Sequence, residues 1–384
     1  MATELADGGP ASFRLSRRCF LGCLASAAAG ATLAPLPAWA KTVLPRALPE
    51  GAEAPFYQRL ADGRVACQAC PWGCELGPGE TSRCRAKANR DGKLVELDYG
   101  LPCVINLDPI EKGPLFHFHP GETSLALGGA GCNLACQYCQ NWQVSQKGAW
   151  ETKNIDMPVA RCSSAAKEKK CRAVTFTYTE PAVELRYATD VFAAARRHGL
   201  YTHAVSAVFL HAKPMRLLCE KADAFSAALK GFDEAFYRDV VGGELAPVLT
   251  ALTTIRESGA WLEIVTLVVP GMNDQPATIG KMAKWIVQNL GADTPLHLTR
   301  FVPEYRLQKL PRTSIETLEA GWKAARDAGL RFVYLGNVPG HNAENTFCPS
   351  CQTRLVARLG FKLLENRVQN GKCPTCGAAI PGKW

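Results

Sequence analysis

Three cysteines, Cys132, Cys136 and Cys139, lie on one short segment of the 384-residue chain with the spacing Cys-x3-Cys-x2-Cys. Three thiolates placed in this way can bind three irons of a [4Fe–4S] cluster, and the fourth iron then has no protein ligand. An open coordination position is typical of metal sites that carry out chemistry. A zinc knuckle or disulfide formation is the alternative. Zinc would need a fourth ligand nearby, and the nearest histidines, His117 and His119, lie upstream across an expected turn.

Two further groups among the 17 cysteines have metal-ligand spacing. They are Cys67, Cys70, Cys74 and Cys84, and Cys348, Cys351, Cys373 and Cys376. The second group forms two Cys-Pro-x-Cys knuckles, which predict a structural zinc ribbon with four thiolates around Zn²⁺. The first group is less regular, so zinc is favoured there and a second iron–sulfur cluster is the alternative. Disulfides fit both groups poorly, because Cys-x2-Cys is a strained loop for a structural bridge.

The N-terminal segment 1–40 has the features of a twin-arginine export signal. Arg17 and Arg18 precede an apolar, alanine-rich stretch over 22–36, and Ala38-Trp39-Ala40 supplies a small-x-small cleavage site. Export to the periplasm or cell envelope is therefore expected, with a cytoplasmic location as the alternative. No stretch is apolar and long enough to predict a stable membrane span.

The formal net charge of +9 does not indicate a nucleic-acid-binding protein. Thiolates bound to metal carry net negative charge and bring the balance closer to neutrality. The densest basic run, over 167–170, contains Glu168 and is typical of a solvated helix face. A zinc-ribbon protein that binds nucleic acid is disfavoured for the same reason, since no basic stripe is present.

From residue 123 onward the sequence alternates short β-branched runs with helical patterns, which predicts an α/β fold with a parallel sheet. Strands are expected over 123–127, 173–178, 202–208, 222–229, 261–269, 294–301 and 331–335, and helices over 182–198, 275–290 and 313–328. A hairpin with an Asp91-Gly92 turn is expected earlier in the chain. The expected domains are a signal (1–40), a linker (41–61), a four-cysteine metal module with a lead-in (62–122), the main domain (123–340) and the ribbon (341–384).

Sites in parallel sheets lie at the carboxyl ends of the strands. The cysteine triad follows the first expected strand, as this rule requires. The second expected strand ends in Tyr178, Thr179, Glu180 and Pro181. These residues are also a suitable helix start, with Thr179 as N-cap, and the two interpretations are compatible.

The triad and its surroundings resemble the radical S-adenosylmethionine (SAM) superfamily. The segments Asp108–Phe118, Asn141–Gln143 and Leu335–Gly340, together with the N-terminal cysteines, resemble the radical enzyme of the AmmeMemoRadiSam system, a group related to pyruvate formate-lyase activating enzymes. The resemblance covers residues 60 to 384 and implies a partial (β/α)6 barrel. It assigns Tyr138 to the cofactor, together with Tyr178, Thr179 and Glu180, which match the Gly-Gly-Glu-Pro element of the superfamily.

The resemblance also implies a reaction. SAM chelates the open iron, and one electron cleaves it to methionine and a 5′-deoxyadenosyl radical that abstracts hydrogen from substrate. A low-potential electron donor would be needed, and Memo-like, AMMECR-like or glycyl-radical proteins are candidate partners. The chain departs from the family pattern at Ala207-Val208 and at Ala228, near the expected contacts to ribose, cofactor carboxylate or substrate. An exported electron-transfer or metal-binding module is the alternative function, although such a module would be expected to have a fourth cysteine.

Overall fold

The computed structural model describes residues 42–43 and 48–384. The predicted twin-arginine signal (1–40) lies outside these residues. Among the helices within them, none is both long and apolar enough to cross a membrane.

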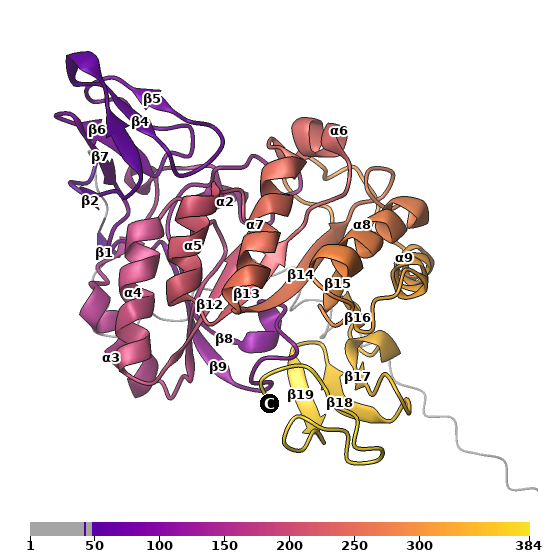
Figure 1. The fold of residues 1–384 in the computed structure, drawn as a ribbon. Coiled ribbons are helices and arrows are strands. Elements are labelled where there is room, and N and C mark those ends of the chain that lie inside the picture. The colour runs from indigo at the N-terminus through magenta and orange to yellow at the C-terminus, as the bar shows by residue number, and fades with distance from the viewer. Residues whose placement is uncertain (1–41, 44–47) are drawn as a thin grey trace, which may run out of the picture. The chain divides into compact units, whose positions relative to one another are not determined.

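An eight-stranded mixed sheet forms the centre of the described chain (Figure 1). Its strands, in chain order, are β8 (Val104–Pro109), β9 (Thr123–Gly128), β11 (Ala173–Phe176), β12 (Tyr201–Ser206), β13 (Ala224–Ala228), β14 (Trp261–Val268), β15 (Leu296–Arg300) and β16 (Val333–Gly336). The spatial order is β16-β15-β14-β13-β12-β11-β9-β8. All neighbours are parallel except β8 and β9, which are antiparallel. The predicted parallel α/β arrangement is therefore confirmed.

Helices lie in the connections between successive parallel strands. They are α2 (Trp142–Ser145), α3 (Val159–Glu168), α4 (Leu185–Arg197), α5 (Ala212–Lys221), α6 (Glu234–Phe236), α7 (Leu245–Ser258), α8 (Pro276–Asn289) and α9 (Ile315–Asp327). The longer ones, α3, α4, α5, α7, α8 and α9, cover one face of the sheet (Figure 1). In α4, Ala188, Val191, Phe192 and Ala195 recur at helical spacing and are fully buried. This apolar stripe is what holds the helix on the sheet.

The opposite face of the sheet carries polar side chains toward the amino ends of the strands. Ser124, Thr175, His203 and Ser226 form a hydrogen-bonded chain across four neighbouring strands. The segment 113–118 crosses this face. Its backbone accepts hydrogen bonds from Ser226 and donates two to the buried Glu263 carboxylate. A backbone segment thus fills the amino-end half of this face.

Two small sheets precede the central one. The first contains β2 (Ala52–Glu53), β7 (Lys93–Glu96) and β6 (Lys87–Arg90), and the second contains β3 (Tyr57–Arg59), β4 (Val65–Cys67) and β5 (Glu75–Leu76). The predicted Asp91-Gly92 hairpin turn joins β6 to β7, with positive φ at both residues.

Two predicted boundaries differ from the structure. The segment 41–61, predicted as a linker, contributes β2, β3 and β1 (Thr42–Val43), which pairs with β10 (Asn154–Ile155). Its polar, proline-rich composition concealed strands of only two or three residues. The central sheet also begins with β8 instead of at residue 123, because half-buried β8 pairs along its whole length with β9.

The C-terminal sheet consists of β17 (Thr346–Phe347), β18 (Arg354–Leu359) and β19 (Lys362–Asn366). Arg358 donates a hydrogen bond to the Phe116 carbonyl, and the Lys383 backbone N–H donates to the His117 carbonyl. Since 113–118 crosses the amino-end half of the central sheet, the C-terminal segment is attached at that end.

Candidate functional site

The triad lies on the loop that leaves the carboxyl end of β9, where the sequence predicted it. Gly131 has a φ of +96°, and a Cβ there would lie 2.3 Å from the Cys84 carbonyl oxygen. Only glycine therefore fits at the start of this loop. Cys132, Cys136 and Cys139 are free thiols.

Two polar groups lie within hydrogen-bonding distance of triad sulfurs. The Leu134 backbone N–H points at Cys132 Sγ at 3.4 Å, and the Ser145 hydroxyl lies 3.3 Å from Cys139 Sγ. Hydrogen bonds to ligand sulfurs tune the potential of iron–sulfur clusters. Burial raises the pKa of the Cys132 and Cys136 thiols. A thiol with a raised pKa stays protonated unless a positively charged metal centre binds its sulfur. The three thiols therefore form a donor set that fits a [4Fe–4S] cluster.

The predicted cofactor residues Tyr178, Thr179 and Glu180 follow β11 directly. The Glu180 carboxylate is fully buried and accepts hydrogen bonds from the Ser206 hydroxyl and the Ala207 N–H, each at 2.6 Å. Burial raises its pKa, and its charge acts on Cys132. Glu180 therefore connects the ends of β11 and β12 beside the triad. The Thr179 hydroxyl donates to the Gly129 carbonyl at 3.0 Å.

Three non-glycine residues at this edge of the sheet have a strained backbone. Tyr178, Val208 and Asn337 have positive φ values of 70°, 48° and 61°, and they follow β11, β12 and β16. Non-glycine residues rarely adopt this conformation, and a β-branched valine least of all. Strain of this kind clusters at functional sites, so these three positions support a site at the carboxyl ends of the strands.

Lys230 follows β13, two residues after the departure at Ala228. Its positive charge acts on Cys136 and on Glu180, opposing the rise in pKa that burial causes at both groups. Its backbone is fixed by hydrogen bonds to Tyr237 and Asn273. The positive charge of Lys230, on the loop after β13, therefore acts on the triad.

Tyr138 is only 4% exposed, and its ring stacks against Phe236 at a centroid distance of 6.3 Å. In this structure the ring packs into the core, and its assignment to the cofactor remains a prediction.

Two polar residues of β8 contact the Tyr178 side chain, and sequence reasoning assigned neither to the site. Asn106 donates to the Tyr178 hydroxyl at 3.0 Å, and that hydroxyl donates to the Asp108 carboxylate. Lys112 pairs with Asp108 at 2.8 Å. The available signal was the period-2 placement of Asn106 and Asp108 among apolar residues, which puts both on one face of a strand.

The N-terminal thiols Cys67, Cys70, Cys74 and Cys84 all line one small hollow. Trp72, Lys87 and Asn133 complete much of its wall. Burial raises the pKa of Cys70 to about 12. The structure thus brings the four predicted ligands of this group around one space.

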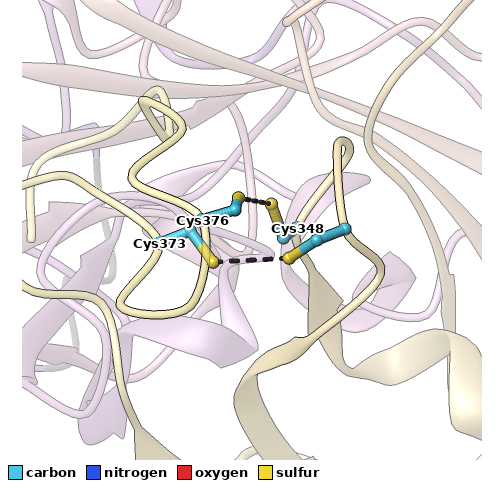
Figure 2. Close-up of side chains that lie close together, drawn as sticks. Cys348, Cys373 and Cys376 are labelled. Carbon is cyan, nitrogen blue, oxygen red and sulfur yellow. Dashed lines mark hydrogen bonds between the residues drawn. The ribbon is translucent and has the colours of Figure 1, made fainter.

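The C-terminal thiols form a tighter cluster (Figure 2). The Sγ atoms of Cys348, Cys351, Cys373 and Cys376 all lie within 4.8 Å of one another, with pair distances of 3.6 and 3.7 Å across the two knuckles. Four sulfurs this close suit a single tetrahedral metal ion. The grouping of these four predicted ligands is confirmed.

Comparison with known proteins gives the following matches. The family model for the radical SAM superfamily matches residues 127–283. An uncharacterized protein of Methanocaldococcus jannaschii is 37% identical over 330 residues, which are 85% of this chain and 98% of that protein. The benzylsuccinate synthase activating enzyme of Thauera aromatica is 35% identical over 79 residues, 21% of this chain and 24% of that enzyme. A domain of a pyruvate-formate lyase-activating enzyme from Bacteroides vulgatus aligns with 43% of this chain and 99% of its own, at 16% identity and a TM-score of 0.39.

Proposed function

Because this chain belongs to the radical SAM superfamily, we propose that Cys132, Cys136 and Cys139 hold a [4Fe–4S] cluster that acts on SAM. When both are bound and one electron arrives from a low-potential donor, they supply a 5′-deoxyadenosyl radical that abstracts hydrogen from a substrate. The substrate is a protein or a small molecule, and activation of a glycyl-radical protein is one form of this chemistry.

The observation that carries the proposal is the position of the triad. Three free thiols follow β9 at the carboxyl end of a parallel sheet, and the charges of Glu180 and Lys230 act on two of them. An amino acid carries an ammonium and a carboxylate group, which are complementary to these two side chains. We therefore assign Glu180 and Lys230 to positioning the methionyl end of SAM.

The residues around Glu180 order the site instead of reacting. Ser206 and Ala207 hold the Glu180 carboxylate, and Asn141 donates to the Tyr178 carbonyl at 2.7 Å. The departure at Ala207-Val208 thus preserves a backbone donor to Glu180, although it removes a polar side chain. Ala228 leaves the end of β13 without a carboxylate beside Lys230, and we expect this to change the contacts to ribose or substrate.

We propose further that the C-terminal thiols hold a structural zinc ion, and that residues 1–40 direct export by the twin-arginine route. A pathway that carries folded proteins would allow the cluster to be inserted before export. Memo-like and AMMECR-like proteins are the partners proposed from the family resemblance.

The test is anaerobic SAM cleavage by the full chain. The protein is reconstituted with iron and sulfide and reduced with dithionite, and 5′-deoxyadenosine is measured by chromatography. We expect product from the wild type and none from Cys136→Ala. Cys219→Ala is the matched control, because Cys219 is a buried thiol outside the three cysteine groups. Equal product from Cys136→Ala and Cys219→Ala would refute the proposal.

A further inference from the structure

The four N-terminal thiols come from two turns that converge on one hollow. Cys67 ends β4, Cys70 and Cys74 lie on the loop to β5, and Cys84 lies between β5 and β6. The Cys67 N–H donates to the Cys74 carbonyl at 2.9 Å, which closes the first loop. Cys67 and Cys84 are 7% and 8% exposed, whereas Cys70 and Cys74 are partly exposed.

The spacing of these thiols differs from that of the C-terminal set. Within residues 42–43 and 48–384, the C-terminal set is the only one with three or more potential ligand atoms all within 4.8 Å. A single Zn²⁺ with bonds of about 2.3 Å requires that closeness. The N-terminal thiols do not meet it, and neither does the catalytic triad. The N-terminal set therefore resembles the triad, whose expected occupant is larger than one ion.

The wall of the hollow accommodates a negatively charged metal centre. Lys87 lines it and is 2% exposed, with its Nζ donating to the Val183 carbonyl at 2.5 Å. An ammonium group is seldom buried without an opposite charge nearby. Glu96 lies 3.9 Å from Lys87 Nζ, and a metal cluster on four thiolates would add further negative charge beside it. The Ser82 hydroxyl lies 3.0 Å from Cys84 Sγ, as a donor to a cluster sulfur would.

The hollow is also built directly onto the triad loop. Asn133, the residue after Cys132, lines the hollow, and its carbonyl accepts a hydrogen bond from Trp72 Nε1 at 2.6 Å. The Cys84 carbonyl contacts Gly131 on the other side of Cys132. The N-terminal module therefore packs against the triad loop on both sides of Cys132.

From these observations we propose that Cys67, Cys70, Cys74 and Cys84 bind a second iron–sulfur cluster of the [4Fe–4S] type, instead of zinc, beside the catalytic triad. This inference does not depend on SAM cleavage. It places a redox-active group in the N-terminal module, which packs against the loop that carries the proposed catalytic cluster.

Metal analysis of a triad-free chain tests the proposal. The full-length variant Cys132→Ala/Cys136→Ala/Cys139→Ala is reconstituted anaerobically, and its iron, sulfide and zinc are measured. We expect about four irons per chain, a [4Fe–4S] signal in the electron paramagnetic resonance spectrum after reduction, and about one zinc from the C-terminal thiols. About two zinc ions with no iron, or about one zinc with no iron, would overturn the proposal.

The converse variant and the wild type supply the second measurement, which holds even if the triad-free chain fails to fold. Cys70→Ala/Cys74→Ala should contain about four irons, and the wild type about eight. A wild type that saturates at about four irons would contradict a second cluster. If the wild type binds about eight irons but does not cleave SAM, the second cluster stands and only the proposed reaction fails.

Discussion

Tyr178 and Val208 adopt backbone conformations that usually belong to glycine, and each lies two residues after a strand of the central sheet. Such residues cost on the order of 1–3 kcal/mol each and persist only where their surroundings fix them. The chain departs from the family pattern at 207–208, and Val208 has the left-handed conformation there. The turn is retained because it aims the Ala207 N–H at the Glu180 carboxylate.

Glu180 provides the first prediction at this scale. Glu180→Gln places an amide N–H₂ against the donors Ser206 Oγ and Ala207 N, leaving at least one buried donor unpaired at a cost of about 1–3 kcal/mol. We expect lower thermal stability and SAM binding weakened at least about tenfold, measured by equilibrium dialysis. Ser206→Ala is the control, because it removes one donor and leaves the carboxylate. Equal effects of the two variants would contradict a charge-dependent role for Glu180.

Two buried histidines predict the pH dependence of stability. Burial lowers the pKa of His203 to about 3 and that of His117 to about 4, from an ordinary 6.5. Below pH 6.5 the two histidines take up protons in the unfolded chain but not in the folded chain. Their contribution to the free energy of unfolding is therefore complete above pH 6.5 and is lost as the pH falls toward 4. In that window each histidine lowers the free energy of unfolding by about 1.4 kcal/mol for every pH unit of acidification.

Urea unfolding at several pH values between neutral and mildly acidic measures this slope. We expect His203→Gln to remove about half of it, because one of the two rings then cannot gain a proton on unfolding. An unchanged slope would show that His203 does not cause the acid sensitivity.

The conformation of the loop that bears the triad requires glycine at position 131. Gly199, which also has positive φ, serves as a control for the backbone strain alone. Gly131→Ala would place a Cβ 2.3 Å from the Cys84 carbonyl oxygen, whereas a Cβ at Gly199, also at positive φ, would have no neighbouring atom within 4 Å. Both substitutions carry the left-handed strain of about 1–2 kcal/mol. We expect only Gly131→Ala to lose iron from the reconstituted protein. Similar iron contents in both variants would mean that the close approach to Cys84 is not required.

The elements of the parallel sheet could be predicted because most of the strands are short apolar runs, several of them rich in β-branched residues. All seven predicted strands occur, with ends shifted by a few residues. β8 was not predicted, since an antiparallel edge strand is half-buried and mixes Asn106 and Asp108 with apolar residues. The short strands over 42–59 were missed because two or three residues are too few to show a period.

At the scale of the described molecule, the three cysteine groups with metal-ligand spacing lie at the two ends of the central sheet. The triad and the N-terminal thiols lie at the carboxyl-end loop, and the C-terminal thiols belong to a segment attached at the amino ends through Phe116 and His117. The two regions can therefore be perturbed separately.

Loss of the C-terminal metal should consequently spare the catalytic loop. We expect Cys376→Ser to lose about one zinc per chain and to lower the thermal unfolding temperature, because only three of the four clustered thiolates then remain to hold the ion. Iron content and 5′-deoxyadenosine formation should remain within about twofold of the wild type. A large loss of iron in this variant would show that the ribbon supports the triad.

The sequence by itself determined which residues can bind metal, because thiol spacing along the chain is a local property. It also determined the parallel sheet and the position of the triad after its first strand, because apolar periodicity is local too. Only the tertiary structure decided what surrounds these thiols. The hollow shared by Cys84 and Asn133, and the contacts of Tyr178 with Asn106 and Asp108, join residues about 50 to 70 positions apart in sequence. Contacts between residues so distant depend on how the strands pair, and no local pattern encodes them.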